Sequence, residues 1–220
     1  MKRTDKESLI AGIIVGTVVV AVFGALIYFT ASAKQGTAQT SQSAANSMAD
    51  HHGGGSPAGS SPVASLSELM DKPVPSFSLK DKNGNQYSPE NLRGKNIVLF
   101  FNEGLMCYPA CWNQIVALAK DNQLKRDDTV VLSVVVDSPQ DWRRAVEKMP
   151  ELAEATVVFD EGAEVSKKLG MLWTKSSMHY GSLPGHTYMI INKDGIVKHV
   201  FDDPNMAIHN GQLVEELARI

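Results

Sequence analysis

The stretch IVLFFNEGLMCYPACW, residues 97–112, decides the fold class of this chain. It opens with an unbroken apolar run, Ile97–Phe101, which is typical of a strand buried on both faces inside a sheet. Pro109 follows, and proline suits the first position of a helix because its missing N–H costs nothing there. The stretch therefore predicts a buried strand that leads into a helix, with Cys107 just before the helix and Cys111 in its first turn.

Similar patterns recur through residues 66–220. Apolar runs predict further strands at Val130–Val136, Thr156–Phe159, Tyr188–Ile191 and Ile196–Phe201. Segments with helical spacing lie at Cys111–Ala119, Pro139–Met149, Glu161–Leu169 and Gln212–Ile220. Asn83-Gly84 is a hairpin turn signal, and Asn192–Gly195 joins the last two strands as an antiparallel pair. Strands that alternate with helices predict an α/β fold with a mixed central sheet covered on both faces.

Cys107 and Cys111 are the two cysteines of the chain. At the start of a helix, unpaired N–H groups and the positive end of the macrodipole favour a thiolate. A thiolate is the nucleophile that disulfide or peroxide chemistry needs. The alternative is a pair of buried cysteines that act as small apolar side chains. Their position at a strand-to-helix junction favours a redox or metal-binding role.

The spacing of the pair adds a second inference. Side chains four residues apart on a regular helix have Cβ atoms about 5–6 Å apart, whereas a disulfide needs roughly 3.5–4.5 Å. Closing Cys107–Cys111 therefore requires Cys107 to leave helical geometry, which Pro109 permits. So short a loop constrains little of the unfolded chain. This favours a catalytic or regulatory disulfide over a structural one.

The N-terminal residues predict a membrane anchor. Leu9–Phe29 carries no charge, and a helix of that length reaches roughly 30 Å, enough to cross a bilayer. Three cations precede it and Lys34 alone follows, so the positive-inside rule places the N-terminus in the cytoplasm. Ala31-Ser32-Ala33 leaves a cleaved signal peptide as the alternative, although such apolar cores are normally shorter. We expect residues 1–33 to be a cytoplasmic tip and a single-pass anchor in the cell membrane.

Residues 34–65 are rich in Gly, Ser, Ala, Thr and Gln without apolar periodicity, which predicts a flexible linker. Residues 66–220 then form the globular domain on the extracytoplasmic side. The chain has 21 Lys and Arg against 24 Asp and Glu, a formal net charge of −3. It lacks the basic surplus that nucleic-acid binding needs, so we expect no nucleic-acid partner.

Motifs spread over residues 66–220 resemble those of the thioredoxin-fold redoxins. This group includes peroxiredoxins of the alkyl hydroperoxide reductase/thiol-specific antioxidant family and exported thiol–disulfide oxidoreductases. Lys72–Leu79 is similar to the family's opening strand, and Tyr87–Lys95 to the segment that ends in Gly-Lys before the central strand. Phe159–Gly162 resembles the Asp-x-x-Gly before a later helix, and His186–Gly195 the late strand pair. The resemblance implies a thioredoxin-like fold and a thiol-dependent oxidoreductase without a bound cofactor.

The chain departs from these relatives at the positions that carry their chemistry. Peroxiredoxins have a Thr or Ser three residues before the peroxidatic cysteine, where this chain has Gly104 before Cys107. The position of the arginine that supports the peroxidatic cysteine in peroxiredoxins is occupied by His186 in this chain. Thioredoxin-like reductases have C-x-x-C and a cis-proline, whereas this chain has C-x-x-x-C, with Pro184 displaced by two residues.

The C-x-x-x-C spacing itself resembles that of the membrane-tethered copper-delivery proteins of cytochrome oxidase assembly. This resemblance implies an alternative function, copper binding by Cys107, Cys111 and His186, with His179 as a second candidate histidine. Methionine thioethers can assist such a soft-metal site, and the candidates are Met106, Met178, Met189 and Met206. The proline pattern of that family around its cysteines is missing here.

We therefore expect a membrane-tethered, extracytoplasmic oxidoreductase with an antioxidant role in cell redox homeostasis. Cys107 attacks peroxide or a protein disulfide, and Cys111 resolves the intermediate. His186 is a general base for Cys107, a metal ligand or a packed side chain, and Glu103 is a proton carrier or a surface charge. The expected partners are the membrane through residues 9–29, an extracytoplasmic thiol reductant, and a peroxide or protein disulfide substrate.

Overall fold

The computed structural model describes residues 65–220. The predicted anchor (residues 1–33), the membrane contact at residues 9–29 and all but the last residue of the predicted linker (34–65) lie outside the described residues. Across residues 65–220, no helix has both the length and the apolar character needed to cross a bilayer.

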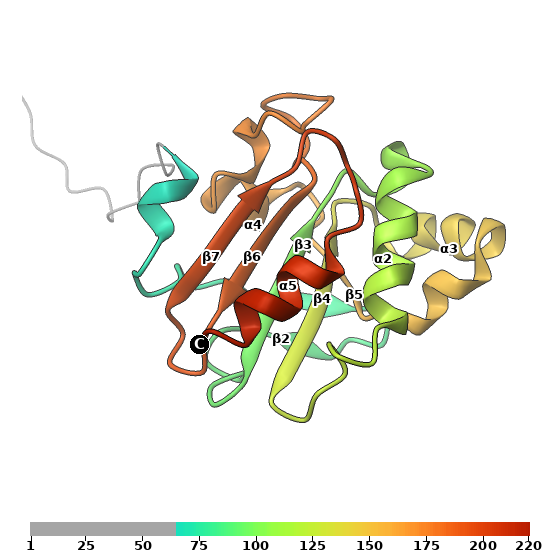
Figure 1. The fold of residues 1–220 in the computed structure, drawn as a ribbon. Helices are drawn as coiled ribbons and strands as arrows, with labels where there is room; N and C mark the ends of the chain where they lie inside the picture. Colours follow the sequence, from blue (N-terminus) through green and yellow to red (C-terminus); the bar gives the residue numbers. More distant parts are fainter. Residues whose placement is uncertain (1–64) are drawn as a thin grey trace, which may run out of the picture. The chain divides into compact units, whose positions relative to one another are not determined.

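Seven strands form one mixed sheet in the order β2-β1-β5-β4-β3-β6-β7 (Figure 1). Strand β3 runs parallel to β4, and β4 to β5, whereas β6 is antiparallel to both β3 and β7. The short strands β1 and β2 add an antiparallel hairpin beside β5. The predicted mixed α/β sheet is confirmed. The strand bounds are β1 (Leu79–Asp81), β2 (Gln86–Tyr87), β3 (Asn96–Phe101), β4 (Thr129–Val135), β5 (Val157–Phe159), β6 (Thr187–Ile191) and β7 (Val197–Asp202).

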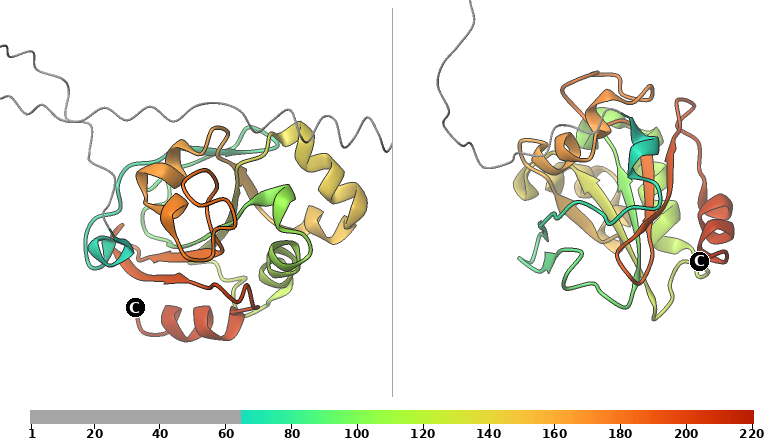
Figure 2. Two further views of the ribbon diagram at one scale, coloured as in Figure 1. Left: turned by 90° about the horizontal axis from the view of Figure 1, so that it is seen from above. Right: turned by 90° about the vertical axis from the view of Figure 1, so that its left-hand side faces the viewer.

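Strand β3 is buried along its whole length, which explains its unbroken apolar run. Val98 and Phe100 point into the core on one face of the sheet, while Ile97, Leu99 and Phe101 point into the core on the other. The two faces are covered by different elements, so the sheet lies between two layers (Figure 2).

Three helices, α2 (Ala110–Lys120), α3 (Pro139–Lys148) and α5 (Asn210–Leu217), supply the core on the face of Phe100. The opposite core includes residues of the 3-10 helices η1 (Leu66–Leu69) and η4 (Met171–Trp173), and α4 (Glu164–Lys168) packs partly against it. Two further 3-10 helices connect elements, η2 (Gly104–Cys107) before α2 and η3 (Pro150–Glu154) after α3.

Helix ends follow their local capping chemistry. Ser138 caps α3 as its sequence predicts, because its Oγ accepts the Asp141 N–H at 3.1 Å and proline takes the next position. Pro109 stands at the N-cap of α2, one residue earlier than predicted. Helix α4 is shorter than predicted, because the Asp160 carboxylate accepts the N–H groups of Val165 and Ser166 and sets the first turn there.

Candidate redox site

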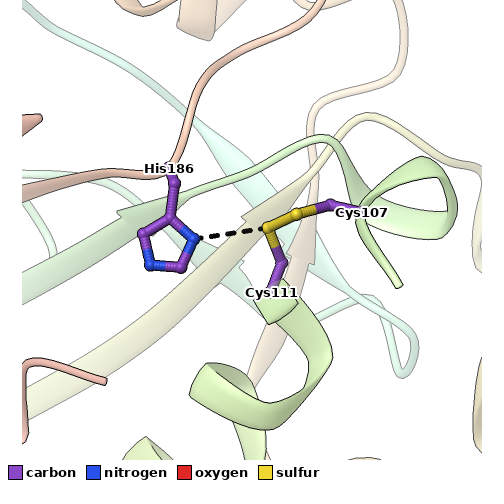
Figure 3. A group of neighbouring side chains, drawn as sticks. All are labelled: Cys107, Cys111 and His186. Carbon is purple, nitrogen blue, oxygen red and sulfur yellow. Dashed lines mark hydrogen bonds between the residues drawn. A yellow bond between two sulfur atoms is a disulfide. The ribbon is translucent and has the colours of Figure 1, made fainter. Parts of the chain in front are cut away.

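The cysteine pair lies just beyond the end of the central strand β3. Cys107 is the last residue of η2, and Cys111 is the second residue of α2. Their sulfurs form a disulfide, with the two Cα atoms 5.4 Å apart (Figure 3). Cys107 therefore lies outside the α-helix, as closing a four-residue spacing requires.

His186 reaches the disulfide from a different part of the chain, the residue just before β6. Its Nδ1 lies 3.4 Å from Cys111 Sγ (Figure 3). The side chain is 1% exposed, and the Phe100 ring packs against it with centroids 4.6 Å apart. The contact is with Cys111 and not with Cys107, so the geometry places any proton transfer by His186 at the second cysteine.

The other ring nitrogen of His186 belongs to a buried polar network. Nε2 lies 2.8 Å from the Tyr188 hydroxyl and 3.3 Å from the Ala207 carbonyl oxygen, and that hydroxyl lies 3.4 Å from the same carbonyl. Burial lowers the pKa of His186 to about 4, so the ring is neutral near pH 7. A proton on Nε2 lets the ring donate to the Tyr188 hydroxyl, which in turn donates to the Ala207 carbonyl oxygen. Nδ1 is then left with a lone pair that faces Cys111.

A turn after β7 places a methionine against the first cysteine. Met206 Sδ lies 3.9 Å from Cys107 Sγ. The buried Asp203 carboxylate holds this turn because it accepts hydrogen bonds from the backbone N–H groups of Asn205 and Ala207. His209 Nε2 also lies 2.8 Å from the same carboxylate. Burial acts to raise the pKa of Asp203, but these hydrogen bonds outweigh it and hold the pKa below its usual value. His209 is therefore part of this support.

Glu103 holds a second loop, residues 174–185, beside the site through hydrogen bonds. Its side chain is 2% exposed, so the surface-charge interpretation is wrong. The carboxylate accepts the N–H groups of Met178 at 2.7 Å and His179 at 3.0 Å, and His179 Nδ1 lies 2.8 Å from its second oxygen. A buried acceptor with this many donors is a structural anchor. Residues 174–185 are thereby held against the segment that carries Cys107.

Gly104 has two reasons to be glycine. Its φ is +59°, in the left-handed region. A Cβ built at this position would lie 1.7 Å from Asp137 Oδ2, which accepts the Leu105 N–H at 2.9 Å. Burial raises the pKa of Asp137. The space beside Gly104 is therefore filled by the carboxylate of Asp137, which lies two residues after the end of β4.

The structure shows which of the remaining candidate residues lie at the disulfide and which do not. Among residues 65–220, the potential metal ligands that cluster are Cys107, Cys111 and His186, whose ligand atoms lie within 4.8 Å of one another. His179 turns to Glu103 instead. Of the four candidate methionines, Met206 contacts the disulfide, whereas Met189 is buried in the opposite core. The cis peptide bond found in this part of the chain is Tyr108–Pro109, between the cysteines, and not the bond before Pro184.

Sequence reasoning did not identify Tyr188 or Asp203 as site residues. Tyr188 lies inside an apolar strand, where its pattern predicts only packing. For Asp203, the sequence offers one signal: the segment Asp202-Asp203-Pro204-Asn205 has the composition of a turn. No local pattern indicates that this turn lies beside cysteines a hundred residues earlier.

Comparisons with known proteins find relatives of this chain in sequence and in structure. The family model described as AhpC/TSA family matches residues 70–200. Peroxiredoxin Bcp from Escherichia coli K12 is 32% identical over 146 residues, which cover 62% of this chain and 87% of that protein. The chloroplastic peroxiredoxin Q of Sedum lineare is 28% identical over 135 residues, covering 59% of this chain and 66% of that protein.

Solved structures share the fold at lower identity. Peroxidoxin BcpB from Mycobacterium tuberculosis superposes with a TM-score of 0.55 and 20% identity, covering 69% of this chain and 97% of that one. A putative protein disulfide isomerase from Bacteroides thetaiotaomicron gives a TM-score of 0.52 and 18% identity, covering 68% and 88%. The fold is thioredoxin-like, and the enzyme class is a thiol-dependent oxidoreductase. With a disulfide at the end of the central strand and a family match over residues 70–200, this chain belongs to the AhpC/TSA family.

Proposed function

We propose that this protein is a membrane-tethered, extracytoplasmic redoxin that cycles Cys107 and Cys111 between dithiol and disulfide. The oxidant is a peroxide or a protein disulfide, which gives the protein an antioxidant role. The observation that carries the proposal is the closed Cys107–Cys111 disulfide with His186 Nδ1 3.4 Å from Cys111 Sγ. A pair that closes directly, without another subunit, needs only an external thiol to complete its cycle.

Cys107 is the attacking residue in this proposal. Its thiolate attacks one peroxide oxygen, the O–O bond breaks, and the second oxygen takes a proton and leaves as water or an alcohol. Cys107 becomes a sulfenic acid. With a protein disulfide instead, the same attack forms a mixed disulfide and releases one thiolate of the substrate.

Cys111 then resolves the intermediate, with His186 as the proton acceptor. Because Nδ1 faces Cys111 Sγ, it is placed to take the thiol proton as the sulfur attacks Cys107. The S–O bond breaks, hydroxide leaves and is protonated to water, and the disulfide forms. The two sulfurs together supply the two electrons that reduce the peroxide.

Stopped-flow oxidation by hydrogen peroxide tests the substrate. The reduced full-length protein is mixed with stoichiometric peroxide, and disulfide closure is followed by tryptophan emission and by mass. Closure many orders of magnitude faster than the reaction of a free thiol supports peroxide as substrate. A rate near that of a free thiol leaves protein disulfides as the substrate, because Gly104 supplies no activating hydroxyl.

The roles of the cysteines are tested by serine variants. C111S should still react once with peroxide and stop at a sulfenic acid, whereas C107S should lose the first step. Thiol-dependent turnover by C107S would contradict the assignment.

A second candidate function, copper binding, is favoured by one observation. With the disulfide closed, the two sulfurs and the ligand nitrogen of His186 lie within 4.8 Å of one another, and the Met206 thioether lies beside Cys107, so reduction would leave two thiolates next to an imidazole and a thioether. Thiolate, imidazole and thioether donors suit Cu(I). The reduced protein would then compete with a chelator for Cu(I), and M206L would bind more weakly than the control M189L, whose methionine lies in the opposite core. No binding would remove this candidate, whereas equal affinities of the two variants would remove only Met206 from the copper site.

The location rests on the sequence of residues 1–34. The uncharged run over residues 9–29, with its cations on the N-terminal side, supports an anchor whose globular domain lies outside the cytoplasm. Protease added to intact spheroplasts should remove residues 66–220. Protection of these residues until the cells are lysed would contradict the proposed topology.

A further inference from the structure

A hollow of about 780 Å³ is formed by α3, by the turn between β1 and β2 and by the last residue of β5. Its volume lies within the range of small-molecule binding pockets, about 300–1,000 Å³. None of Cys107, Cys111 and His186 lines it. The hollow is therefore separate from the redox site.

The buried part of the lining is apolar. Trp142 is 4% exposed and Phe159 is 9% exposed, and Val146 is half-buried between solvent and core. Water gains little from contact with such side chains, so an apolar group that replaces it there is favoured. This part of the hollow suits the apolar portion of a ligand.

The exposed part of the lining is charged. Lys82 follows β1 and Arg143 lies on α3, and both side chains are exposed. Glu147 is the one carboxylate of the lining, and it lies four residues after Arg143, a spacing at which helical ion pairs form. Within residues 65–220, however, none of these three side chains takes part in an ion pair. The lining thus has an excess of positive charge, and both of its cations are free to meet an anion.

We propose that this hollow binds a small carboxylate with an apolar tail. The tail covers Trp142, Val146 and Phe159. The carboxylate lies between Lys82 and Arg143, because a planar guanidinium can donate two parallel hydrogen bonds to a carboxylate. The inference is independent of the proposed redox function, since it uses none of the residues of the disulfide site.

An adjoining hollow sets the direction of the ligand. It has a volume of about 330 Å³ and shares Lys82, Trp142 and Phe159 with the first hollow. The carboxylates of Asp81 and Glu154 also line it, and they repel a negatively charged head group. The head group therefore stays at Arg143, which lines the first hollow and not the second.

The test compares three probes on the full-length protein. Octanoate has the proposed charge and tail, octylammonium has the same tail with the opposite charge, and butyrate has the same charge with a shorter tail. Binding is followed by tryptophan emission, because the ligand lies against Trp142. The free concentration of each probe is measured by dialysis, which corrects for its partition into detergent micelles. We expect octanoate to bind at least about tenfold more tightly than either of the other probes.

Two substitutions on α3 form a matched pair. R143A should weaken octanoate binding about tenfold, because a hydrogen-bonded charge partner is lost. R144A removes the same charge one residue later, from a side chain that pairs with Asp141 and does not line the hollow. It should change octanoate binding by less than about twofold.

A charge reversal gives a result that loss of folding cannot imitate. K82E/R143E should bind octylammonium more tightly than octanoate, because two carboxylates then take the place of the two cations. This gained preference, together with the matched pair, would support the site.

Four outcomes would overturn the proposal. Equal affinities of the wild-type protein for octanoate and octylammonium would show that the cations do not select an anion. Butyrate binding as tightly as octanoate would show that the apolar side chains do not hold a tail. Equal effects of R143A and R144A would attribute binding to the general charge of the surface. Binding of none of the probes would refute the site itself.

Discussion

Replacing Gly104 by alanine tests how the turn before Cys107 is built. Two penalties add in this variant. Alanine at φ +59° costs about 1–2 kcal/mol in the left-handed region. Its Cβ would also lie 1.7 Å from Asp137 Oδ2, so that carboxylate must swing away and release the Leu105 N–H. Losing a hydrogen bond to a half-buried carboxylate adds about 1–2 kcal/mol, for a total of about 2–4 kcal/mol.

The second penalty can be separated from the first by a double-mutant cycle. D137A already lacks the hydrogen bond to Leu105 and has no side chain in the path of the new Cβ. The loss of this bond is therefore counted in both single variants but occurs once in G104A/D137A. We expect the double variant to be less destabilised than the sum of the single variants by about 1–2 kcal/mol.

Urea denaturation of the oxidised proteins, followed by tryptophan emission, gives the four free energies of unfolding. A matched control is G162A, because Gly162 has a similar φ of +81° but no atom within 4 Å of the built Cβ. It should show the backbone penalty alone and no coupling to D137A. Additive effects of G104A and D137A would refute the view that Asp137 fills the space beside Gly104. The same geometry predicts that G104T destabilises the turn and does not create a working peroxidase hydroxyl.

Three further predictions concern the site's supports. E103A should lower the free energy of unfolding by about 2–4 kcal/mol, because it leaves the N–H groups of Met178 and His179 without their acceptor; the exposed control E161A should stay within about 0.5 kcal/mol in the same urea titration. Since burial lowers the pKa of His186 to about 4, only the unfolded state binds its proton between about pH 4 and 6.5. The free energy of unfolding should therefore rise with pH across this range and reach its full value above it. In urea titrations, H186Q should reduce the difference between the free energies of unfolding at pH 7 and pH 4.5 by up to about 3 kcal/mol. S138A should cost about 1 kcal/mol in thermal or urea unfolding, because α3 loses its N-cap acceptor; no loss would show that water replaces the hydroxyl.

Individual strands, helix starts and turns could be predicted from the sequence because each depends on a short pattern of neighbouring residues. The apolar run at residues 97–101 predicts β3, and the Ser138-Pro139 pair predicts where α3 begins; both are confirmed. Asn192–Gly195 likewise predicts the antiparallel pairing of β6 and β7, which the structure has. Patterns of this kind work because burial and capping act over a few residues.

The cysteine pair was found in the same way, since both residues and Pro109 lie within five positions. Their chemistry follows from their place at the start of a helix, a local property. The histidine was selected by comparison with known families, and its placement beside Cys111 instead of Cys107 is a matter of register. That placement depends on β6 pairing with β3, with Thr187 opposite Phe101.

What the sequence determined by itself is therefore the α/β pattern, the position of the cysteine pair after the central strand and the segments around it. Only the tertiary structure decided that Glu103 is buried and pins a loop seventy residues later, that Asp137 excludes a side chain at position 104, and that Met206 meets Cys107. These contacts join residues far apart in the chain. A sequence pattern reports the conformational preferences of neighbouring residues. Contacts between residues far apart in the chain are instead determined by the order of the strands in the sheet and by the packing of two cores on β3.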